Sequence, residues 1–475
     1  MIVKRSWLAD RITPLEAYVN LREAAKREQD VAGASFLLES VTGGERWGRY
    51  TILGYRPRRH AVLGRDAVWR VDGRAIDSKN RDPLRAAEEA LAIDGGTSET
   101  HVIDRIERAH FGFFAWDLIH EIERVKKWPD PGTTPLARFV GDATTIVFDN
   151  FAQTITIAGP TSEDVDRAFH DAQTGHALTW LAAPSGPRPT ANATLNMSDL
   201  EYEKIVLRAK EYIAAGDAFQ IVLARRFSVA QGDADPLAVY RAMRQMNPSP
   251  YMFYFDFPAC DDAGAMQILG ASPETLVRLE GELMTVRPIA GTRRRGKTPE
   301  EDLALEEELL ADPKELAEHV MLIDLGRNDV GRVAEIGSVK LTRRMQVERY
   351  SHVMHIVSEV EGRIDRAKTS PLDVFRAAFP AGTLSGAPKL RAMQIVRELE
   401  LGPRGVYGGA VGWMSRSGDF DLAIAIRTAA CENGSFQVTA GAGIVEASDP
   451  PAEAAETRAK ASAVLASIAS AAPLV

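Results

Sequence analysis

Residues 312–330 read DPKELAEHVMLIDLGRNDV and form the best helix signal in the chain. Asp312 is a capping carboxylate and Pro313 suits the first helical position, so we expect a helix to begin there. Glu315 and Glu318 are three residues apart and project from one face, where their charges repel unless a cation lies between them. The pair is therefore either a solvated acidic face or part of a site for a hard cation with oxygen ligands.

A second acidic helix start lies near the C-terminus, where residues 448–460 read SDPPAEAAETRAK. Glu453 and Glu456 are again three residues apart, and Lys460 lies four residues beyond Glu456 on the same side. Two capped helices with such faces are suited to hold one magnesium ion together, with positions left for a substrate carboxylate and water. Zinc fits poorly, because Glu315 stands where a zinc-binding helix has its first histidine.

Composition narrows the class of protein. A chain of 475 residues can bury a large core and is too long for a single ordinary domain. The net charge of -9, without long runs of one sign, gives no support to a nucleic-acid surface. Cys260 and Cys431 lack paired spacing, which suits a reducing compartment. The first residues lack the apolar core of a signal peptide, and the apolar tail after Lys460 is short and dotted with serine. We therefore expect a soluble, cytoplasmic protein without a membrane span.

Strands and helices are predicted in runs rather than in strict alternation, which favours an α+β fold. The segment 183–192, APSGPRPTAN, is rich in helix and strand breakers and is the best linker signal. It divides the chain into a predicted N-terminal half (residues 1–182), a linker (183–197) and a C-terminal domain (198–470). We expect that domain to open with a helix whose capping box joins Ser198 and Glu201.

Nucleotide binding is an alternative, because residues 291–298, GTRRRGKT, satisfy the P-loop pattern. The context argues against it. Pro288 is expected to interrupt the strand that must precede such a loop, and three successive arginines are bulky for a loop that wraps a phosphate. The segment 320–324, which would supply the partner magnesium ligand, lies inside the predicted acidic helix.

A series of longer motifs follows in order along the chain. They are DAFQIVLARRF (217–227), ASPET (271–275), PIAGTR (288–293), IDLGRND (323–329), SHVMH (351–355), GTLSGAPK (382–389), YGG (407–409), IAIR (424–427) and GAGI (441–444). This series resembles the chorismate-utilising enzymes, and among them the large subunits of anthranilate synthase. The resemblance covers nearly the whole chain and is strongest after Ser198. It implies layered antiparallel β-sheets flanked by helices, built as two interleaved subdomains.

The resemblance also implies a reaction. Ammonia adds to ring carbon two of chorismate while the hydroxyl on carbon four leaves, and pyruvate is then eliminated to give anthranilate. A magnesium ion holds the ring carboxylate, with Glu318 and Glu456 as its ligands and Glu315 and Glu453 nearby. Glu274 protonates the leaving hydroxyl, which requires a raised pKa so that its carboxyl group is protonated at neutral pH.

The remaining site residues follow from the same resemblance. Those that bind substrate are Gly291, Thr292, Tyr407, Arg427, Gly441, Ala442, Gly443 and Lys460, and those with catalytic roles are Glu274, Thr383 and His355. Arg427 suits bidentate pairing with a carboxylate, and glycines let backbone amides approach a ligand closely. The ordinary alternatives are a buried, hydrogen-bonded histidine at 355, plain strand residues at 407 and 427, and a simple turn at 441–443.

Two positions distinguish members of the family by the group that attacks the ring. Members that add water carry a lysine base where this chain has Gln220, and aminodeoxychorismate synthases carry a nucleophilic lysine where it has Ala290. Both differences indicate attack by ammonia and formation of anthranilate. Aminodeoxychorismate and 2-amino-2-deoxyisochorismate stay open as alternative products. Glu274 and Ala290 are expected to face one site from adjoining strands.

The N-terminal half resembles relatives that bind tryptophan as a feedback inhibitor. The matching segments are LLES (37–40) and NPSPYM (247–252), and the expected contacts are Glu39, Ser40, Pro250, Tyr251 and Met252. Glu39 is expected to reach the α-amino group, and the ordinary alternative is a core strand and a turn. An inactive homologue that only binds tryptophan is a further alternative, although the acidic residues of the site are all present.

The resemblance further implies a separate partner. Neither cysteine lies in a glycine-rich nucleophile turn, so we expect no glutaminase in this chain. A glutamine amidotransferase subunit is expected to supply ammonia, which makes a hetero-oligomer the expected assembly.

Overall fold

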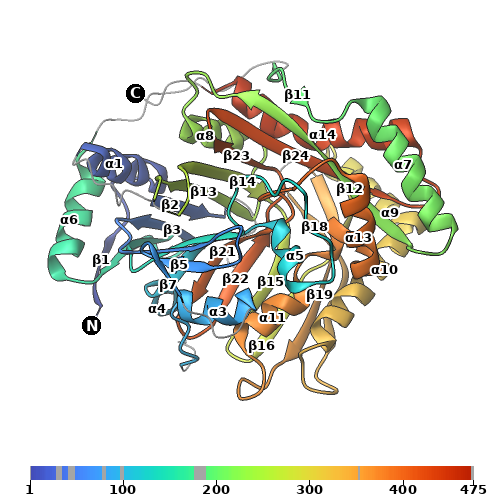
Figure 1. Cartoon of the computed structure of the whole chain (residues 1–475). Coiled ribbons are helices and arrows are strands. Elements are labelled where there is room, and N and C mark those ends of the chain that lie inside the picture. Colours follow the sequence, from blue (N-terminus) through green and yellow to red (C-terminus); the bar gives the residue numbers. More distant parts are fainter. Residues whose placement is uncertain are drawn as a thin grey trace.

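The computed structural model describes residues 2–27, 35–40, 49–76, 82–96, 101–175, 189–260, 262–350 and 353–471. Within these ranges, two twelve-stranded antiparallel sheets lie in layers, and helices flank them (Figure 1). The predicted α+β fold with layered antiparallel sheets and flanking helices is confirmed. The first two residues of the 351–355 motif and residues 183–188 of the predicted linker lie outside the described residues.

The first sheet combines strands from both ends of the chain. Its order is β1 (Val3–Leu8), β10 (Thr154–Gly159), β9 (Thr144–Asp149), β3 (Tyr50–Tyr55), β2 (Ser35–Glu39), β13 (Tyr251–Phe257), β14 (Met266–Ser272), β23 (Thr428–Glu432), β24 (Ser435–Ile444), β12 (Gln220–Ala230) and β11 (Thr194–Leu195), with β20 (Gly386–Ala387) beside β12.

The second sheet is built in the same way. Its order is β17 (Ile289–Arg294), β19 (Val353–Arg363), β16 (Leu283–Val286), β15 (Thr275–Glu280), β22 (Phe420–Ile424), β21 (Ala410–Ser415), β7 (Ala109–Phe114), β8 (Ala137–Gly141), β4 (Arg59–Leu63), β5 (Trp69–Val71) and β6 (Arg74–Ala75), with β18 (Lys340–Arg349) beside β19. Strands from before and after the predicted linker therefore share both sheets, and the division into an N-terminal half and a C-terminal domain stays a prediction.

The helices follow local sequence signals. They are α1 (Pro14–Arg27), α3 (Pro83–Ala90), α4 (Val102–Ile106), α5 (Ile119–Ile122), α6 (Ser162–Gln173), α7 (Asp199–Ala214), α8 (Pro236–Met246), α9 (Pro299–Ala311), α10 (Pro313–Gly331), α11 (Pro371–Ala378), α12 (Gly382–Ser385), α13 (Lys389–Leu399) and α14 (Pro450–Ala469), besides a 3₁₀ turn at Trp116–Leu118. The capping box predicted for Ser198 and Glu201 is confirmed at the start of α7. Within the described residues, no helix is long and apolar enough to cross a lipid bilayer.

Three apolar layers result from the alternation of side chains along the strands. Between the sheets, Phe36 of β2 stacks on Phe111 of β7 with their ring centroids 4.0 Å apart. The next residue, Leu37, lies in the core between the first sheet and the helices α1, α6, α8 and α14. A third core joins the second sheet to α3, α10 and α11. The space between the sheets is therefore bounded by residues from distant parts of the chain.

The P-loop pattern at 291–298 belongs to a different local structure. Contrary to expectation, Pro288 does not interrupt a strand, because it lies just before β17, where a missing amide costs no ladder hydrogen bond. After β17, the amide of Gly296 donates to Asp302 (2.8 Å) and that of Lys297 donates to Glu301 (2.7 Å). These amides, which a phosphate would need, already bind carboxylates of α9.

Candidate active site and a second cavity between the sheets

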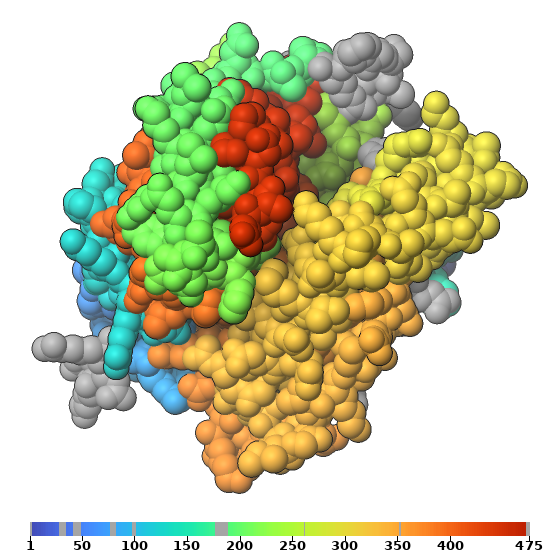
Figure 2. All heavy atoms as spheres, turned by 90° about the vertical axis from the view of Figure 1, so that its right-hand side faces the viewer, coloured from blue at the N-terminus to red at the C-terminus, as the bar shows by residue number. Residues whose placement is uncertain are grey.

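A cavity of about 670 Å³ is bordered by α10, α14 and strands of both sheets. Figure 2 shows the side of the molecule on which the red α14 lies next to the yellow and amber segment that contains α9 and α10. Almost all the predicted active-site residues line this cavity, namely Glu274, Gly291, Thr292, Glu315, Glu318, His355, Thr383, Tyr407, Arg427, Gly441, Gly443, Glu453, Glu456 and Lys460.

Ala442 is the exception among the predicted substrate-binding residues. Its side chain is fully buried in an apolar cluster with residues of α7 and β12, because alternation along β24 turns it to the face opposite the neighbouring glycines. Only its backbone remains available to a ligand. The expected role of this segment rests on its backbone, so it stays a prediction.

Both acidic helices begin where their sequences predicted. The Asp312 carboxylate accepts hydrogen bonds from the amides of Lys314 (3.0 Å) and Glu315 (3.3 Å) at the start of α10. Asp449 accepts from the amide of Ala452 (3.2 Å) at the start of α14. Capping stabilises the first turns, which carry Glu315 and Glu453, and Glu318 and Glu456 follow three residues later on the same faces.

The four glutamates share the cavity but have separate partners. Glu315 lies 3.4 Å from Arg293, and Glu456 pairs with Lys460 at 2.7 Å. Burial and the charge of Glu315 raise the pKa of Glu318. Burial likewise raises the pKa of Glu453, and the charge of Glu456 adds to the rise. The cavity therefore holds more negative charge than its own basic groups neutralise locally.

The donor set suits magnesium. All the candidate ligand atoms are carboxylate oxygens, the type that this hard cation prefers. Among the described residues, no three His, Cys, Asp or Glu side chains converge closely enough to hold a metal by themselves. That arrangement agrees with an ion that takes one or two protein carboxylates and completes its shell with water and substrate. Within the part of the chain that the structure describes, no zinc site with four such ligands is present.

Glu274 is a buried carboxyl group at the start of β15. Its carbonyl accepts from the amide of Ile424 (3.0 Å), and its side chain accepts from the hydroxyl of Thr383 in α12 (3.0 Å). Burial raises the pKa of Glu274 to about 7, against the opposing effects of the Thr383 hydrogen bond and the Arg427 charge. A carboxyl group with this pKa is partly protonated at neutral pH and can donate a proton.

Arg427 provides a cation in the same cavity. It is half-buried, its backbone has a positive φ of 49°, and its guanidinium makes no hydrogen bond to any other described residue. Such a backbone strain is retained only where the surrounding structure holds the residue in place, and it is typical of functional sites. Burial lowers the pKa of Arg427 and raises that of the neighbouring Tyr407 to about 12. Arginine and a protonated tyrosine together form a donor pair for a carboxylate.

Lys460 connects α14 to the glycine segment of β24. Its ammonium group donates to the carbonyl of Gly441 (3.0 Å) and pairs with Glu456. A Cβ at Gly441 would come within 3.1 Å of the Tyr407 hydroxyl, so the absence of a side chain leaves room for that tyrosine in the cavity.

His355 lies on β19 opposite Thr292 of β17. Its Nδ1 is 3.0 Å from the carbonyl of Gly291 and 3.1 Å from the hydroxyl of Thr292. Donation from Nδ1–H to that carbonyl leaves Nε2 as the basic nitrogen, and burial lowers the pKa of the ring, which favours the neutral form. The geometry therefore combines the two interpretations of His355, since the ring is hydrogen-bonded and also lines the cavity. Gly291 itself has a φ of 67°, which favours glycine.

The residues that distinguish family members also line the cavity. Gln220 and Ala290 face it from β12 and β17, together with Glu274. The expectation that Glu274 and Ala290 sit on adjoining strands is wrong, because β16 and β19 lie between β15 and β17. The two residues nevertheless line one cavity across the intervening strands. Ser448 was not predicted as a site residue, yet it lines the cavity and its hydroxyl accepts from the amide of Val445 (3.0 Å).

A second, mostly apolar cavity of about 140 Å³ lies between the two sheets. All five predicted inhibitor contacts line it, namely Glu39, Ser40, Pro250, Tyr251 and Met252. The Glu39 carboxylate, however, accepts from the Tyr240 hydroxyl (2.6 Å) and pairs with Arg244, both on α8. Because these partners already hold it, the expected contact between Glu39 and an α-amino group would require their exchange.

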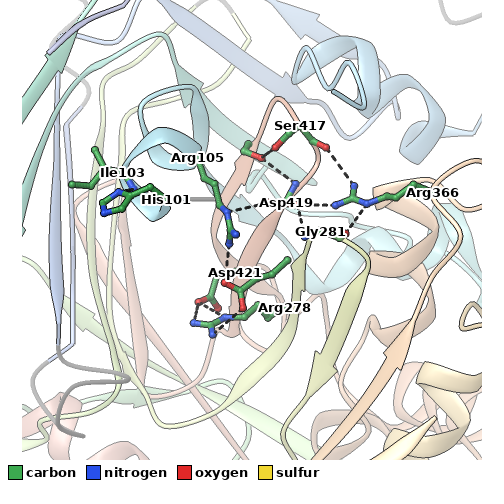
Figure 3. A network of polar contacts seen from close by, with 11 residues as sticks. His101, Ile103, Arg105, Arg278, Gly281, Arg366, Ser417, Asp419 and Asp421 are labelled. Atoms are coloured by element: carbon green, nitrogen blue, oxygen red, sulfur yellow. Dashed lines mark hydrogen bonds and ion pairs between the residues drawn. The ribbon is translucent and has the colours of Figure 1, made fainter. Parts of the chain in front are cut away.

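The sequence patterns did not predict the charged and polar residues that form one wall of this second cavity, here called its polar wall. Arg278 of β15 donates to Asp421 of β22 (2.9 Å), and the nearby Asp419 pairs with Arg105 of α4 and Arg366 (Figure 3). The Tyr251 hydroxyl bonds Asp421 and Thr275, each at 2.9 Å. No signal in the sequence joins these residues, because they come from five separate segments.

Comparisons with known proteins agree with the motifs. The family model described as chorismate binding enzyme matches residues 38–466. Anthranilate synthase component 1 of Pseudomonas aeruginosa is 44% identical over 478 residues, which cover 95% of this chain and 92% of that protein. The protein of the same name from Acinetobacter calcoaceticus is 42% identical over 484 residues, with coverages of 98% and 94%.

Solved structures extend the similarity to three dimensions. Anthranilate synthase component I of Streptococcus pneumoniae has a TM-score of 0.74 at 33% identity and covers 97% of this chain and 99% of its own. The isochorismate synthase MenF of Escherichia coli, at 18% identity, shares the fold with a TM-score of 0.71 and coverages of 98% and 94%. The chain therefore belongs to the chorismate-binding enzyme family.

Proposed function

We propose that the chain is an anthranilate synthase large subunit, which converts chorismate and ammonia to anthranilate and pyruvate in tryptophan biosynthesis. The observation that carries the proposal is a buried carboxyl group, Glu274, with a pKa of about 7, in one cavity with four glutamates and with Arg427, whose guanidinium has no hydrogen-bond partner among the described residues. An acid, a carboxylate-binding cation and a metal-binding acidic wall are the three requirements of the reaction. The names of the relatives support the same activity.

Magnesium would be held by Glu318 of α10 and Glu456 of α14, with Glu315 and Glu453 beside them. When bound, it neutralises the ring carboxylate and the repelling glutamates. The second carboxylate of chorismate is bound by Arg427, Tyr407 and the backbone of residues 441–443. Lys460 keeps that segment next to α14 through its bond to the Gly441 carbonyl.

Glu274 donates its proton to the hydroxyl that leaves carbon four, and the Thr383 hydroxyl orients the carboxyl group through its hydrogen bond. Nε2 of His355 takes a proton in the elimination of pyruvate, while Gly291 and Thr292 hold the ring in position. Glu274, with its raised pKa, and His355, with its lowered pKa, line the same cavity, so it holds both an acid and a base.

The nucleophile is ammonia rather than water or lysine. Gln220 has no basic nitrogen with which to activate water, and Ala290 cannot form a covalent adduct. Aminodeoxychorismate and 2-amino-2-deoxyisochorismate are the alternative products within the family, and Ala290 disfavours the first of them. We further propose that a separate glutamine amidotransferase subunit supplies the ammonia in a hetero-oligomer located in the cytoplasm, where thiols such as Cys260 and Cys431 stay reduced.

The cavity between the sheets is proposed to bind tryptophan as a feedback inhibitor. Its apolar lining from Met252, Pro250 and Leu38 suits an indole ring, and its polar wall of Arg278 and Asp421 suits a zwitterion. Ser40 and Tyr251 provide further polar atoms at its border.

The decisive experiment mixes the pure chain with chorismate, magnesium and an ammonium salt and follows anthranilate fluorescence. Anthranilate and pyruvate are expected in equal amounts, and the reaction should stop when magnesium is chelated. The product mass decides among the family members, and accumulation of an aminated, non-aromatic acid without pyruvate would contradict the proposal. Absence of any turnover, with tryptophan still bound, would favour the regulatory homologue.

A further inference from the structure

Asp329 of α10 and Lys389 at the start of α13 both belong to the motifs described above, but neither has a part in the proposed chemistry. The Lys389 ammonium group donates to Asp329 Oδ2 (2.8 Å) and to the carbonyl of Ala378 (3.3 Å). The Lys389 side chain is 12% exposed, and the Asp329 side chain is 8% exposed. A buried ion pair contributes little to stability on average, so its position calls for another explanation.

A small cavity of about 50 Å³ adjoins this pair. It is lined by Asp329 together with Glu274 and Thr383, the proposed acid and its hydrogen-bond donor. Asp329 Oδ1 is buried and has no hydrogen-bond partner within the described residues. An unsatisfied buried carboxylate oxygen is costly, and a space of this size holds water when polar groups border it. Water therefore fits between Asp329 and Glu274.

The surroundings of Asp329 and Lys389 favour transfer of a proton between the two side chains. Burial raises the pKa of Asp329 and lowers the pKa of Lys389, so the charged and neutral forms of the pair approach each other in free energy. Arg332 faces both groups and Glu123 faces Lys389. Arg287, which also lines the small cavity, pairs with Glu348 at 2.6 Å.

We propose that water in this cavity joins Glu274 to Asp329 and Lys389, and that this relay returns a proton to Glu274 after each turnover. The inference rests on the proposed function, because it gives the acid of that reaction its proton supply. Asp329 and Lys389 are positioning and relay residues that do not touch the substrate.

The proton balance of the cycle is complete. As the carbon–nitrogen bond forms and the carbon–oxygen bond breaks, Glu274 gives its proton to the hydroxyl, which leaves as water. The added nitrogen loses one proton to solvent. The Glu274 carboxylate then takes a proton from a cavity water, which takes one from the Asp329 carboxyl group. The Lys389 ammonium group gives a proton back to Asp329, and Lys389 then takes a proton from solvent.

The sharpest test is Lys389→Arg. Arginine keeps the positive charge and its bond to Asp329 but does not release a proton, so a merely structural pair would tolerate it. We expect kcat with saturating chorismate and ammonium to fall roughly tenfold or more and its solvent deuterium isotope effect to rise, while KM for chorismate changes little. Lys368→Arg is the matched control, because Lys368 forms an exposed pair with Asp365 (2.7 Å) and should keep wild-type kinetics.

A charge-free double variant, Asp329→Leu with Lys389→Met, tests the relay without leaving a buried charge unpaired. It should unfold at a temperature close to that of the wild type and show the same loss of kcat as Lys389→Arg. Wild-type kcat and isotope effect in Lys389→Arg, or in the double variant where the arginine variant does not fold, would overturn the relay. Failure of the wild-type chain to form anthranilate would instead overturn the proposed function.

Discussion

At the scale of single residues, Glu274 shows how burial turns an ordinary carboxyl group into an acid for neutral pH. Its position in the ASPET motif predicted the role, and the prediction required a raised pKa. The structure supplies the physical cause, which is removal from water at the start of β15, opposed by Thr383 and Arg427. Sequence similarity identified the residue, but only the fold accounts for its protonation.

The first prediction concerns Glu274→Gln. Activity should fall at least about a hundredfold, because the amide cannot donate the required proton. The free energy of unfolding should, in contrast, be higher in the variant than in the wild type above pH 7. A pKa raised from 4.5 to about 7 gives stability that is present below 4.5 and lost as pH rises through 7, and the loss amounts to roughly 3 kcal/mol. Glutamine avoids this loss.

Thermal unfolding of the wild type and Glu274→Gln at pH 5 and pH 8 checks this prediction. The variant should gain stability relative to the wild type at pH 8, and much less at pH 5. Glu280→Gln, a change of the same type at a partly exposed carboxylate on β15, serves as the control. An equal difference at both pH values would show that Glu274 is not buried in the protonated form.

At the scale of elements, α10 and α14 present their acidic faces because each helix is capped by an aspartate and begins with proline. These interactions span four residues or fewer, so the sequence was sufficient to predict them. The strands were less predictable. Glu274 and Ala290 meet in one cavity across two intervening strands, and strand order depends on packing between segments far apart in the chain.

The second prediction concerns the cap of α10. Asp312→Ala removes hydrogen bonds to the amides of Lys314 and Glu315 and the pair with Arg293 (2.8 Å), at a cost of about 1 kcal/mol. The loosened first turn carries Glu315 and leads into Glu318. We therefore expect the magnesium concentration for half-maximal activity to rise several-fold in a titration of the ammonium-dependent reaction.

Asp82→Ala is the control for this measurement. Asp82 caps α3 through the amide of Leu84 (3.0 Å) and pairs with Arg376, as Asp312 pairs with Arg293, but it does not line the large cavity. Its loss of stability should be similar and its magnesium requirement unchanged. A similar magnesium shift in both variants would mean that the effect is general destabilisation.

At the scale of the whole molecule, the smaller cavity, proposed to bind tryptophan, and the larger candidate active-site cavity both use residues of the two sheets. A physical connection runs between them. The Tyr251 hydroxyl, at the border of the smaller cavity, bonds Thr275, which directly follows Glu274. A ligand that shifts the packing of the sheets, or the position of Tyr251, therefore acts on the backbone that holds the acid.

The third prediction concerns Leu38→Phe, which enlarges a half-buried side chain in the wall of the smaller cavity, the one proposed to bind tryptophan. The larger ring should occupy part of the space of about 140 Å³ and weaken tryptophan inhibition at least tenfold, measured against the uninhibited rate of the same variant. Leu8→Phe makes the same change at an exposed site on β1 and should retain normal inhibition. Unaltered inhibition in Leu38→Phe would place the tryptophan site elsewhere.

The sequence by itself determined the features that depend on neighbours in the chain. These are the capped helices, the glutamates three residues apart on α10 and α14, the capping box of α7 and the motifs that identify the family. Short-range hydrogen bonds and side-chain periodicity cause them, so they can be predicted without knowledge of distant residues.

Only the tertiary structure decided which distant residues meet. It joined Asp329 to Lys389 and Tyr251 to Thr275, engaged Glu39 with α8, and turned Ala442 away from the cavity. The order of strands in two large sheets sets these contacts, and that order reflects the burial of whole apolar faces rather than any local preference. The motifs therefore indicated the family and the candidate site residues, while the pairing of Asp329 with Lys389 and the bond between Tyr251 and Thr275 depend on the fold.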